Sequence, residues 1–139
     1  MSFVLDNSVA LAWCFEDEQT PAIMNLLDRV VTTGAVAPLL WPLEALNGLL
    51  VAERRRRLTA EKRVELTGLL RALPVMLDHD TAEKSWEDTL SLAEAFRLSV
   101  YDATYLELAR RRRLPLASMD RALRSAAGAI GVEVLGDAP

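Results

Sequence analysis

The stretch FVLDNSVALAW, residues 3–13, decides the fold that the rest of the chain completes. Three apolar residues run directly into Asp6, and apolar residues then return at helical spacing, with Ser8 placed to cap the helix. A short buried strand followed at once by a helix is how a βαβ unit begins. The Asp6 carboxylate between them must be exposed in a turn, cap the helix or bind a cation. The rest of the sequence is needed to distinguish these roles.

The same alternation of short apolar runs and longer helical stretches continues along all 139 residues. It predicts an α/β fold with a central, mostly parallel sheet of four to five short strands, and we expect one domain over residues 1–139. The expected strands are residues 3–5, 35–37, 74–77, 114–118 and 132–135, and the expected helices are residues 8–15, 20–31, 42–57, 59–72, 101–112 and 120–129, with one more beginning at residue 80.

Local signals set the ends and faces of several helices. Thr59 is expected to cap its helix after a tight corner, so that residues 42–57 and 59–72 form a helical hairpin. Asp80 and Glu83 resemble a capping box. Two apolar stripes are expected, one formed by Leu43, Leu46, Leu50 and Val51 and the other by Trp86, Leu90 and Ala93.

Composition narrows the cellular setting and the kind of partner. Apolar residues make up 51% of the chain, but no run reaches the roughly 18 consecutive residues of a membrane span, so we expect no membrane association. A single cysteine, Cys14, and the absence of a secretory-type start favour a reducing cytoplasm. A net charge of −4 excludes a surface that attracts nucleic acid everywhere, so a polyanion needs a local basic patch or a metal ion.

Four acids stand where an apolar pattern does not call for them. Asp6 ends the first expected strand and Asp120 follows the fourth, while Glu44 and Asp102 lie in the first turns of their helices. Each one alone is better explained as a helix cap or as a partner of the helix dipole. Together they indicate a shared ligand pocket, because ligands of open α/β sheets bind at the carboxyl ends of the strands.

If those ends converge, the four carboxylates repel one another, by about 4 kcal/mol for two charges about 4 Å apart near a protein surface. Protonation or a divalent cation relieves this repulsion. Oxygen ligands suit Mg²⁺ or Mn²⁺. Zinc fits poorly, because His79 and Cys14 are the only His and Cys in the sequence and lie far apart.

The whole chain resembles the PIN-domain family, and within it the VapC-type ribonuclease toxins of VapBC toxin–antitoxin systems. Four segments carry the resemblance in order and spacing: LDNSVALAW (5–13), PLEALNGLL (42–50), YDATYLELA (101–109) and LPLASMDRAL (114–123). The resemblance implies a three-layer α/β/α fold with an acidic pocket for Mg²⁺ or Mn²⁺. It matches Asp6, Glu44, Asp102 and Asp120 to the family acids and gives supporting roles to Ser8, Asn47 and Ser118.

The activity that the resemblance implies is metal-dependent hydrolysis of RNA phosphodiesters by the toxin of a type II pair. The presence of only one His in the sequence agrees with this activity, because a metal-activated water needs carboxylates and a metal rather than paired histidines. In this hypothesis Asp6, Asp102 and Asp120 hold the metal, and Glu44 binds it through water or orients the attacking water. The expected partners are an RNA such as tRNA or rRNA, a cognate VapB-like antitoxin in a groove of the 42–57 and 59–72 helices, and a second copy of the chain.

Other interpretations fit parts of the pattern. An aspartate-nucleophile phosphatase also has an Asp after its first strand, but it typically has a second Asp two residues on, where Ser8 stands. A receiver domain usually has paired acids near its first strand, which the Asp6-Asn7 pair does not supply. A PIN-like module that binds RNA and protein without cutting, and a PIN nuclease that is no toxin, stay open.

Two runs of four arginines, Arg54–Arg57 and Arg110–Arg113, close their helices. Cations at a helix C-terminus complement its dipole and keep the surface solvated, whereas an RNA-binding surface would use them to contact phosphates. We favour the first interpretation, because helices that follow parallel strands end at the edge of the sheet opposite the acids. Trp13, Trp41 and Cys14 are expected in the core and His79 at the surface.

Overall fold

Five short strands form one parallel sheet in the computed structural model, which describes residues 2–136. Their order is β3-β2-β1-β4-β5, so the first strand of the chain lies in the middle with a neighbour on each side. The predicted parallel sheet is therefore confirmed. The strands are β1 (Val4–Leu5), β2 (Ala35–Pro38), β3 (Val75–Asp78), β4 (Leu116–Ala117) and β5 (Val134–Leu135).

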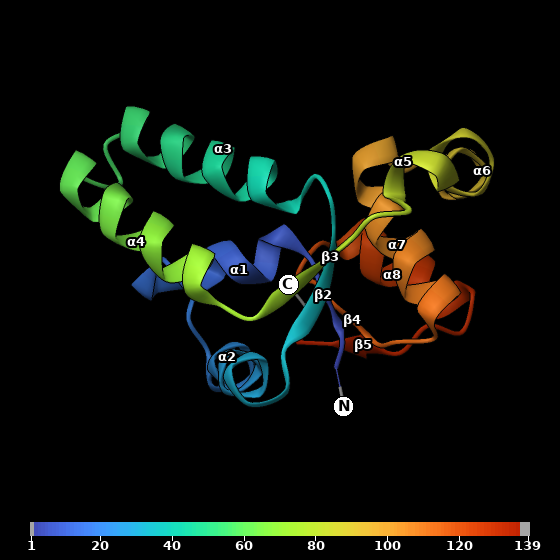
Figure 1. Cartoon of the computed structure of the whole chain (residues 1–139), viewed down its shortest axis with the longest axis horizontal. Coiled ribbons are helices and arrows are strands. Elements are labelled where there is room, and N and C mark those ends of the chain that lie inside the picture. Colours follow the sequence, from blue (N-terminus) through green and yellow to red (C-terminus); the bar gives the residue numbers. More distant parts are fainter. Residues whose placement is uncertain (1, 137–139) are drawn as a thin grey trace.

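Helices cover both faces of this sheet, which confirms the α/β/α layering (Figure 1). In this view the first four helices lie on one side of the strands and the last four on the other. No helix within residues 2–136 is long and apolar enough to cross a membrane. The helices are α1 (Asn7–Ala12), α2 (Pro21–Thr33), α3 (Trp41–Arg54), α4 (Ala60–Ala72), α5 (Thr81–Lys84), α6 (Leu90–Phe96), α7 (Val100–Arg112) and α8 (Arg121–Ala129), with a 3-10 turn η1 (Glu16–Glu18) and a π-helical turn η2 (Ser85–Thr89).

The pairing of β1 with β4 sets the geometry of the carboxyl edge of the sheet. Val4 and Leu5 are fully buried, as the central strand of a covered parallel sheet requires. Leu5 pairs with Ala117, so the next residues, Asp6 and Ser118, come side by side where the strands end. The Asp6 N–H donates to the carbonyl of Ala117 at 3.0 Å and fixes this register.

The helices α3 and α4 form the expected hairpin and pack against each other. Thr59 caps α4 as predicted, because its hydroxyl accepts a hydrogen bond from the Lys62 N–H at 3.1 Å. α3 approaches α1 closely at Gly48, where a Cβ would lie 2.5 Å from Leu11 Cδ1. A glycine at this crossing therefore sets the position of the helix that carries Glu44.

Two predicted helix caps are wrong. Ser8 lies inside α1, and Asp6 occupies the cap position without a side-chain cap bond, because both side chains bond to each other instead. Asp80 precedes α5 and makes no side-chain cap bond either. Its neighbour Thr81 donates to the carbonyl of Asp78 at 3.0 Å, so the start of α5 is tied to the end of β3.

Most residues of the two predicted apolar stripes lie outside the buried faces of their helices, although Ala93 of the second stripe is buried. Leu43 is 71% exposed, because α3 buries smaller and aromatic side chains on a different face. Trp86 is 82% exposed and lies in η2, where the wider π-helical turn shifts the register by one position relative to the following α6. The buried residues of α3 are Trp41, Ala45, Leu49 and Ala52, and those of α6 are Leu92 and Ala93.

Buried ion pairs tie the C-terminal end of α7 to β3. Asp78 is 0% exposed and accepts two hydrogen bonds from Arg111, at 2.6 and 3.1 Å, and one from Arg112 at 3.1 Å. Glu107, 3% exposed, accepts two more from Arg111, at 2.8 and 3.1 Å. Burial raises the pKa of Asp78, but the arginine bonds outweigh burial, and the net effect is a lowered pKa. Asp78 is therefore held ionised, and both carboxylates are paired with arginine.

Candidate active site at the carboxyl edge of the sheet

Four carboxylates lie at or near the starts of helices. Asp6 follows β1 and Asp120 follows β4, at the N-cap positions of α1 and α8. Glu44 lies in the first turn of α3, and Asp102 lies in the first turn of α7, which Ser99 caps. The free N–H groups at helix starts favour negative charge at all four positions. One oxygen of Asp120 also caps α8, accepting from the Ala122 N–H at 3.1 Å.

Two serines fix one oxygen of the Asp6 carboxylate. The hydroxyls of Ser8 and Ser118 both donate to Asp6 Oδ2, at 2.6 and 2.8 Å. Each serine oxygen also accepts a backbone N–H from the loop after β4, Ser8 from Met119 at 2.9 Å and Ser118 from Asp120 at 3.0 Å. Asp6 is thus locked to the loop that carries Asp120, while no described residue donates a hydrogen bond to Asp6 Oδ1.

A buried tyrosine holds the second acid. Tyr105 is 0% exposed, and its hydroxyl donates to Glu44 Oε1 at 2.6 Å, which links α7 to α3. The sequence analysis gives Tyr105 no role, so its contact with Glu44 was missed. The signal that could have found it is the hydroxyl itself, because a buried tyrosine usually has a hydrogen-bond partner.

Burial and neighbouring charges raise the pKa of three of the four acids. Burial raises the pKa of Asp6 to about 6, and the charges of Asp102 and Glu44 add to the rise, while the serine bonds oppose it. Burial also raises the pKa of Glu44, with a further contribution from Asp102. Burial raises the pKa of Asp102, and the charge of Asp120 adds to it. These influences connect Asp102 with each of the other three acids, Asp6, Glu44 and Asp120.

No cation of the described chain, residues 2–136, forms an ion pair with any of these four carboxylates. The donor set consists of carboxylate and hydroxyl oxygens, which suit a hard dication such as Mg²⁺ or Mn²⁺. In the same residues no group of three or more His, Cys, Asp or Glu side chains is arranged so that it could hold a metal ion. The donor chemistry fits a dication, but the side chains do not form a preformed cage.

One oxygen beside Asp6 lacks a hydrogen-bond donor. The side-chain amide oxygen of Asn7 is buried and has no partner among the described residues. Buried polar atoms without partners are rare in folded proteins, so this oxygen marks a place where a bound species can complete the structure. Sequence reasoning gave Asn7 no role, and its only signal was its position next to Asp6.

The remaining singled-out residues lie outside this cluster. Asn47 is exposed on α3, one turn beyond Glu44, and no hydrogen bond within residues 2–136 ties it to the acids. His79 is exposed, as expected. Cys14 is half-buried, and burial raises the pKa of its thiol to about 11, which fits an unreactive cysteine.

Comparisons with known proteins agree with this geometry. A family model described as PIN domain matches residues 3–129. The sequence matches no curated protein. Three solved structures share the fold: FitAcB from Neisseria gonorrhoeae (17% identity, TM-score 0.67, covering 98% of this chain and 97% of that one), PAE2754 from Pyrobaculum aerophilum (23%, 0.69, 96% and 83%) and Mycobacterium tuberculosis VapC20, described as a sarcin–ricin loop cleaving toxin (17%, 0.62, 89% and 94%).

Proposed function

Because this chain belongs to the PIN domain family, we propose that it is a Mg²⁺- or Mn²⁺-dependent endoribonuclease, the toxin of a type II toxin–antitoxin pair. The observation that carries the proposal is the cluster of Asp6, Glu44, Asp102 and Asp120, whose charges act on one another with no cation of the described chain beside them. Perturbed titratable groups of this kind are typical of functional sites. The similar fold of VapC20, described as a toxin that cleaves the sarcin–ricin loop, supports RNA as the substrate.

The residues take different roles in this proposal. Asp6, Asp102 and Asp120 would hold the ion, and Glu44, with one oxygen fixed by Tyr105, would bind it through water or orient the attacking water. When bound, the ion would supply a water of lowered pKa and positive charge beside the scissile phosphate. We expect products with a 5′-phosphate and a 3′-hydroxyl.

The supporting residues act through the acids. Ser8 and Ser118 hold Asp6 Oδ2, which leaves Oδ1 as the oxygen available to a ligand. Because these same serines anchor the backbone of the loop after β4, they also set the position of Asp120. Asn47 is exposed one turn after Glu44, so its role in the proposal is contact with substrate rather than with the ion.

The α3–α4 hairpin supports an antitoxin partner. A pocket of about 450 Å³ lies between α3, α4 and β3, and its walls are mainly apolar. An amphipathic segment of a VapB-like partner would lay its apolar side chains into this groove. Leu46 lines the pocket, and the same two helices expose three further apolar side chains: Leu43, Val64 and Leu69.

A homodimer is also part of the proposal. Large apolar side chains are exposed in η2, α6 and the start of α7, away from the α3–α4 hairpin in Figure 1. Contiguous exposed apolar patches mark protein–protein contacts in soluble proteins, and the proposal treats these side chains as one such patch. The residues are Trp86, Leu90, Val100 and Tyr101.

RNA cleavage with matched variants tests the activity. We expect the purified protein to cut RNA in Mn²⁺ and to stop in excess EDTA, and Asp102→Asn to lose at least about a thousandfold in rate, because it removes a charge from the centre of the cluster. The control Asp28→Asn changes an exposed acid of α2 and should cut at the normal rate. Full activity of Asp102→Asn, or cutting in EDTA, contradicts the assignment.

A second candidate is a PIN-like module that binds RNA and its partner without cutting. The observation that favours it is that the described acids do not stand in a preformed arrangement for a metal ion. The same experiment separates the two candidates. Retarded RNA migration without cleavage products, in Mn²⁺ and in Mg²⁺, supports the binding module, and Mn²⁺-dependent products support the nuclease.

A further inference from the structure

The arginine run at the end of α7 is divided between two surroundings. Arg111 and Arg112 bind Asp78 inside the fold. Arg110 and Arg113 are exposed, and neither forms an ion pair with a residue in the range 2–136. The first pair has a structural role, whereas the second pair leaves two positive charges without partners in a protein of net charge −4.

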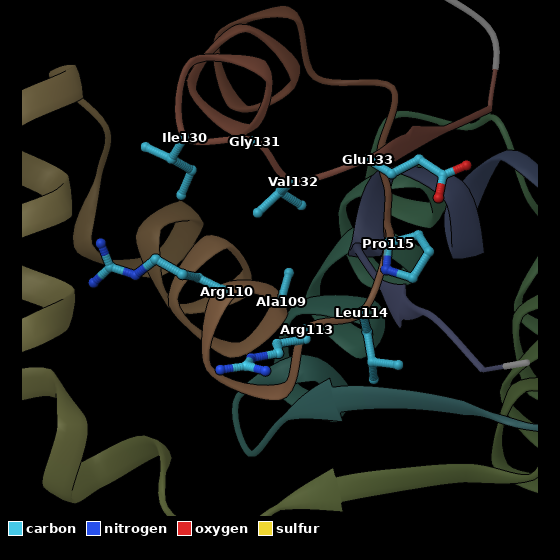
Figure 2. A pocket seen from close by; sticks show the side chains of 9 residues that line it. All are labelled: Ala109, Arg110, Arg113, Leu114, Pro115, Ile130, Gly131, Val132 and Glu133. Atoms are coloured by element: carbon cyan, nitrogen blue, oxygen red, sulfur yellow. The ribbon is translucent and has the colours of Figure 1, made fainter.

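Arg110 and Arg113 line a pocket of about 280 Å³ at the amino edge of the sheet, the edge opposite the four acids (Figure 2). In Figure 2 both guanidinium groups extend to the same side, while the carboxylate of Glu133, the only acid among the described lining residues, is directed away from them. The pocket therefore offers two unneutralised cations beside an apolar wall. That wall consists of Ala109, Leu114, Pro115, Ile130 and Val132.

Two neighbouring helices connect the acids with this pocket. α7 and α8 pack against each other, and each has an acid of the cluster at its cap or in its first turn and ends at the pocket. Arg110 follows Asp102 by eight positions, which is about 12 Å along a helix axis. The exposed side of α8 leaves room for an RNA backbone to pass close to the helix, because its side chains after Arg121 are small: Ala122, Ser125, Gly128 and Ala129.

We propose that this pocket binds one nucleotide of an RNA strand whose scissile phosphate lies at the acids, so the inference rests on the proposed function for its ligand. Arg110 and Arg113 contact phosphate oxygens, which guanidinium groups bind strongly, and the base rests on the apolar wall. The volume is near the lower end of small-ligand pockets and suits one nucleotide rather than a folded RNA element. Because the acids repel RNA, a remote cationic site supplies attraction that the catalytic end lacks.

Binding of RNA without cleavage tests the site. The probe is a fluorescein-labelled single-stranded RNA 12-mer in EDTA, with affinity measured by anisotropy over a range of salt concentrations. We expect the double variant Arg110→Gln/Arg113→Asn to bind about tenfold more weakly and to lower the salt slope by about 1.4, the value for two contacts to a single strand. Asn is chosen because Arg113 has φ 55°, which Asn tolerates.

The other arginine run supplies a matched control. Arg54→Gln/Arg56→Asn removes the same charge, and Arg56 also has a positive φ of 62°, so the backbone change is equivalent. The site predicts that this control keeps affinity and salt slope within a factor of two of the unaltered protein. Equal weakening of both double variants shows a general charge effect and overturns the proposal, as does no measurable RNA binding by the unaltered protein.

A measurement on the unaltered protein avoids any folding defect of the variants. Bound RNA should protect Arg110 and Arg113 from phenylglyoxal more than it protects Arg54 and Arg56, as read by mass spectrometry. Equal modification with and without RNA overturns the site. Failure of the proposed function is distinguishable from failure of this site. If RNA protects the arginines but Mn²⁺ gives no cleavage, the binding site stands and the nuclease proposal fails. If RNA is cleaved but the arginines are not protected, the nuclease proposal stands and the binding site fails.

Discussion

The two ends of α7 hold carboxylates in opposite electrostatic surroundings. At its start, Asp102 lies among other acids, where burial raises the pKa of Asp6, Glu44 and Asp102 and the charge of a neighbouring acid adds to each rise. At its end, Asp78 and Glu107 are buried against Arg111, whose bonds lower the pKa of Asp78. The same residue type is paired inside the fold at one end and left without a cation at the other.

This difference separates acids that serve the structure from acids that serve a ligand. A buried carboxylate with bidentate arginine bonds is compensated in the folded state, and removing one partner leaves the other charge uncompensated. An acid cluster without a cation destabilises the folded state by repulsion, and only a bound cation or protonation relieves it. Mutations at the two ends should therefore change stability in opposite directions.

The largest effect is expected at Asp78. Asp78→Ala removes the partner of Arg111 and Arg112, and the loss of one member of a buried ion pair typically lowers the free energy of unfolding by about 3–5 kcal/mol. Urea unfolding at pH 7 measures this. The control Asp80→Ala removes an acid that is 63% exposed and 3.8 Å from Arg111, and it should change the same quantity by less than about 1 kcal/mol.

Two outcomes would contradict the distinction between structural acids and ligand-binding acids. If Asp78→Ala and Asp80→Ala unfold at the same urea concentration, the buried network does not hold α7 to β3. If Asp102→Asn destabilises the metal-free protein as much as Asp78→Ala does, the acids at the start of α7 are structural, and their separation from the paired acids disappears.

A smaller effect of opposite sign is expected at Asp6. Its pKa is raised from 3.8 to about 6, so between these values the folded state keeps a proton that the unfolded state has lost. The stabilisation is fully present below pH 3.8 and is lost as pH rises to about 6, a change of about 3 kcal/mol for a shift of this size. Asp6→Asn should therefore be more stable than the unaltered protein at pH 7 in EDTA and about equally stable at pH 4.

The pH dependence of the difference is the measurement. Urea unfolding of both proteins at several values from pH 4 to pH 7 isolates Asp6, because the titration of the other groups largely cancels between the two proteins. Mn²⁺ should stabilise the unaltered protein increasingly as pH rises, since an ion binds the deprotonated carboxylate. A constant difference across the range would show that Asp6 is ionised in the folded state at every pH tested.

The sequence predicts the paired and unpaired acids to different degrees. Asp6, Glu44, Asp102 and Asp120 could be found because each interrupts an apolar pattern at the end of a strand or the start of a helix, and parallel strands bring such ends together. Asp78 also ends a strand, but its partner Arg111 lies 33 positions away in a run of four arginines. No local pattern tells which arginine of such a run turns inward.

The helix faces show a second limit of prediction from sequence. The parallel sheet and the hairpin follow from apolar runs and turn residues, but the spacing of Leu43 and Leu46 gave the wrong face of α3. The buried face is set by the close crossing at Gly48, which depends on the position of α1 in space. Tyr105 illustrates the same point for the site, because only the fold shows that its hydroxyl meets Glu44.

The smallest predicted effect concerns this contact. Tyr105→Phe keeps the buried ring but removes the donor to Glu44 Oε1, and the loss of a hydrogen bond to a charged group should slow RNA cleavage about tenfold. Because that bond lowers the pKa of Glu44, its loss should move the acidic limb of the pH–rate profile upward. Tyr101→Phe is the matched control, since it removes a hydroxyl from a residue that is 62% exposed and keeps the apolar ring of the proposed dimer contact, so rate and profile should be unchanged. A lowered rate with an unshifted profile would mean that Tyr105 supports the packing of α7 against α3 rather than the ionisation of Glu44.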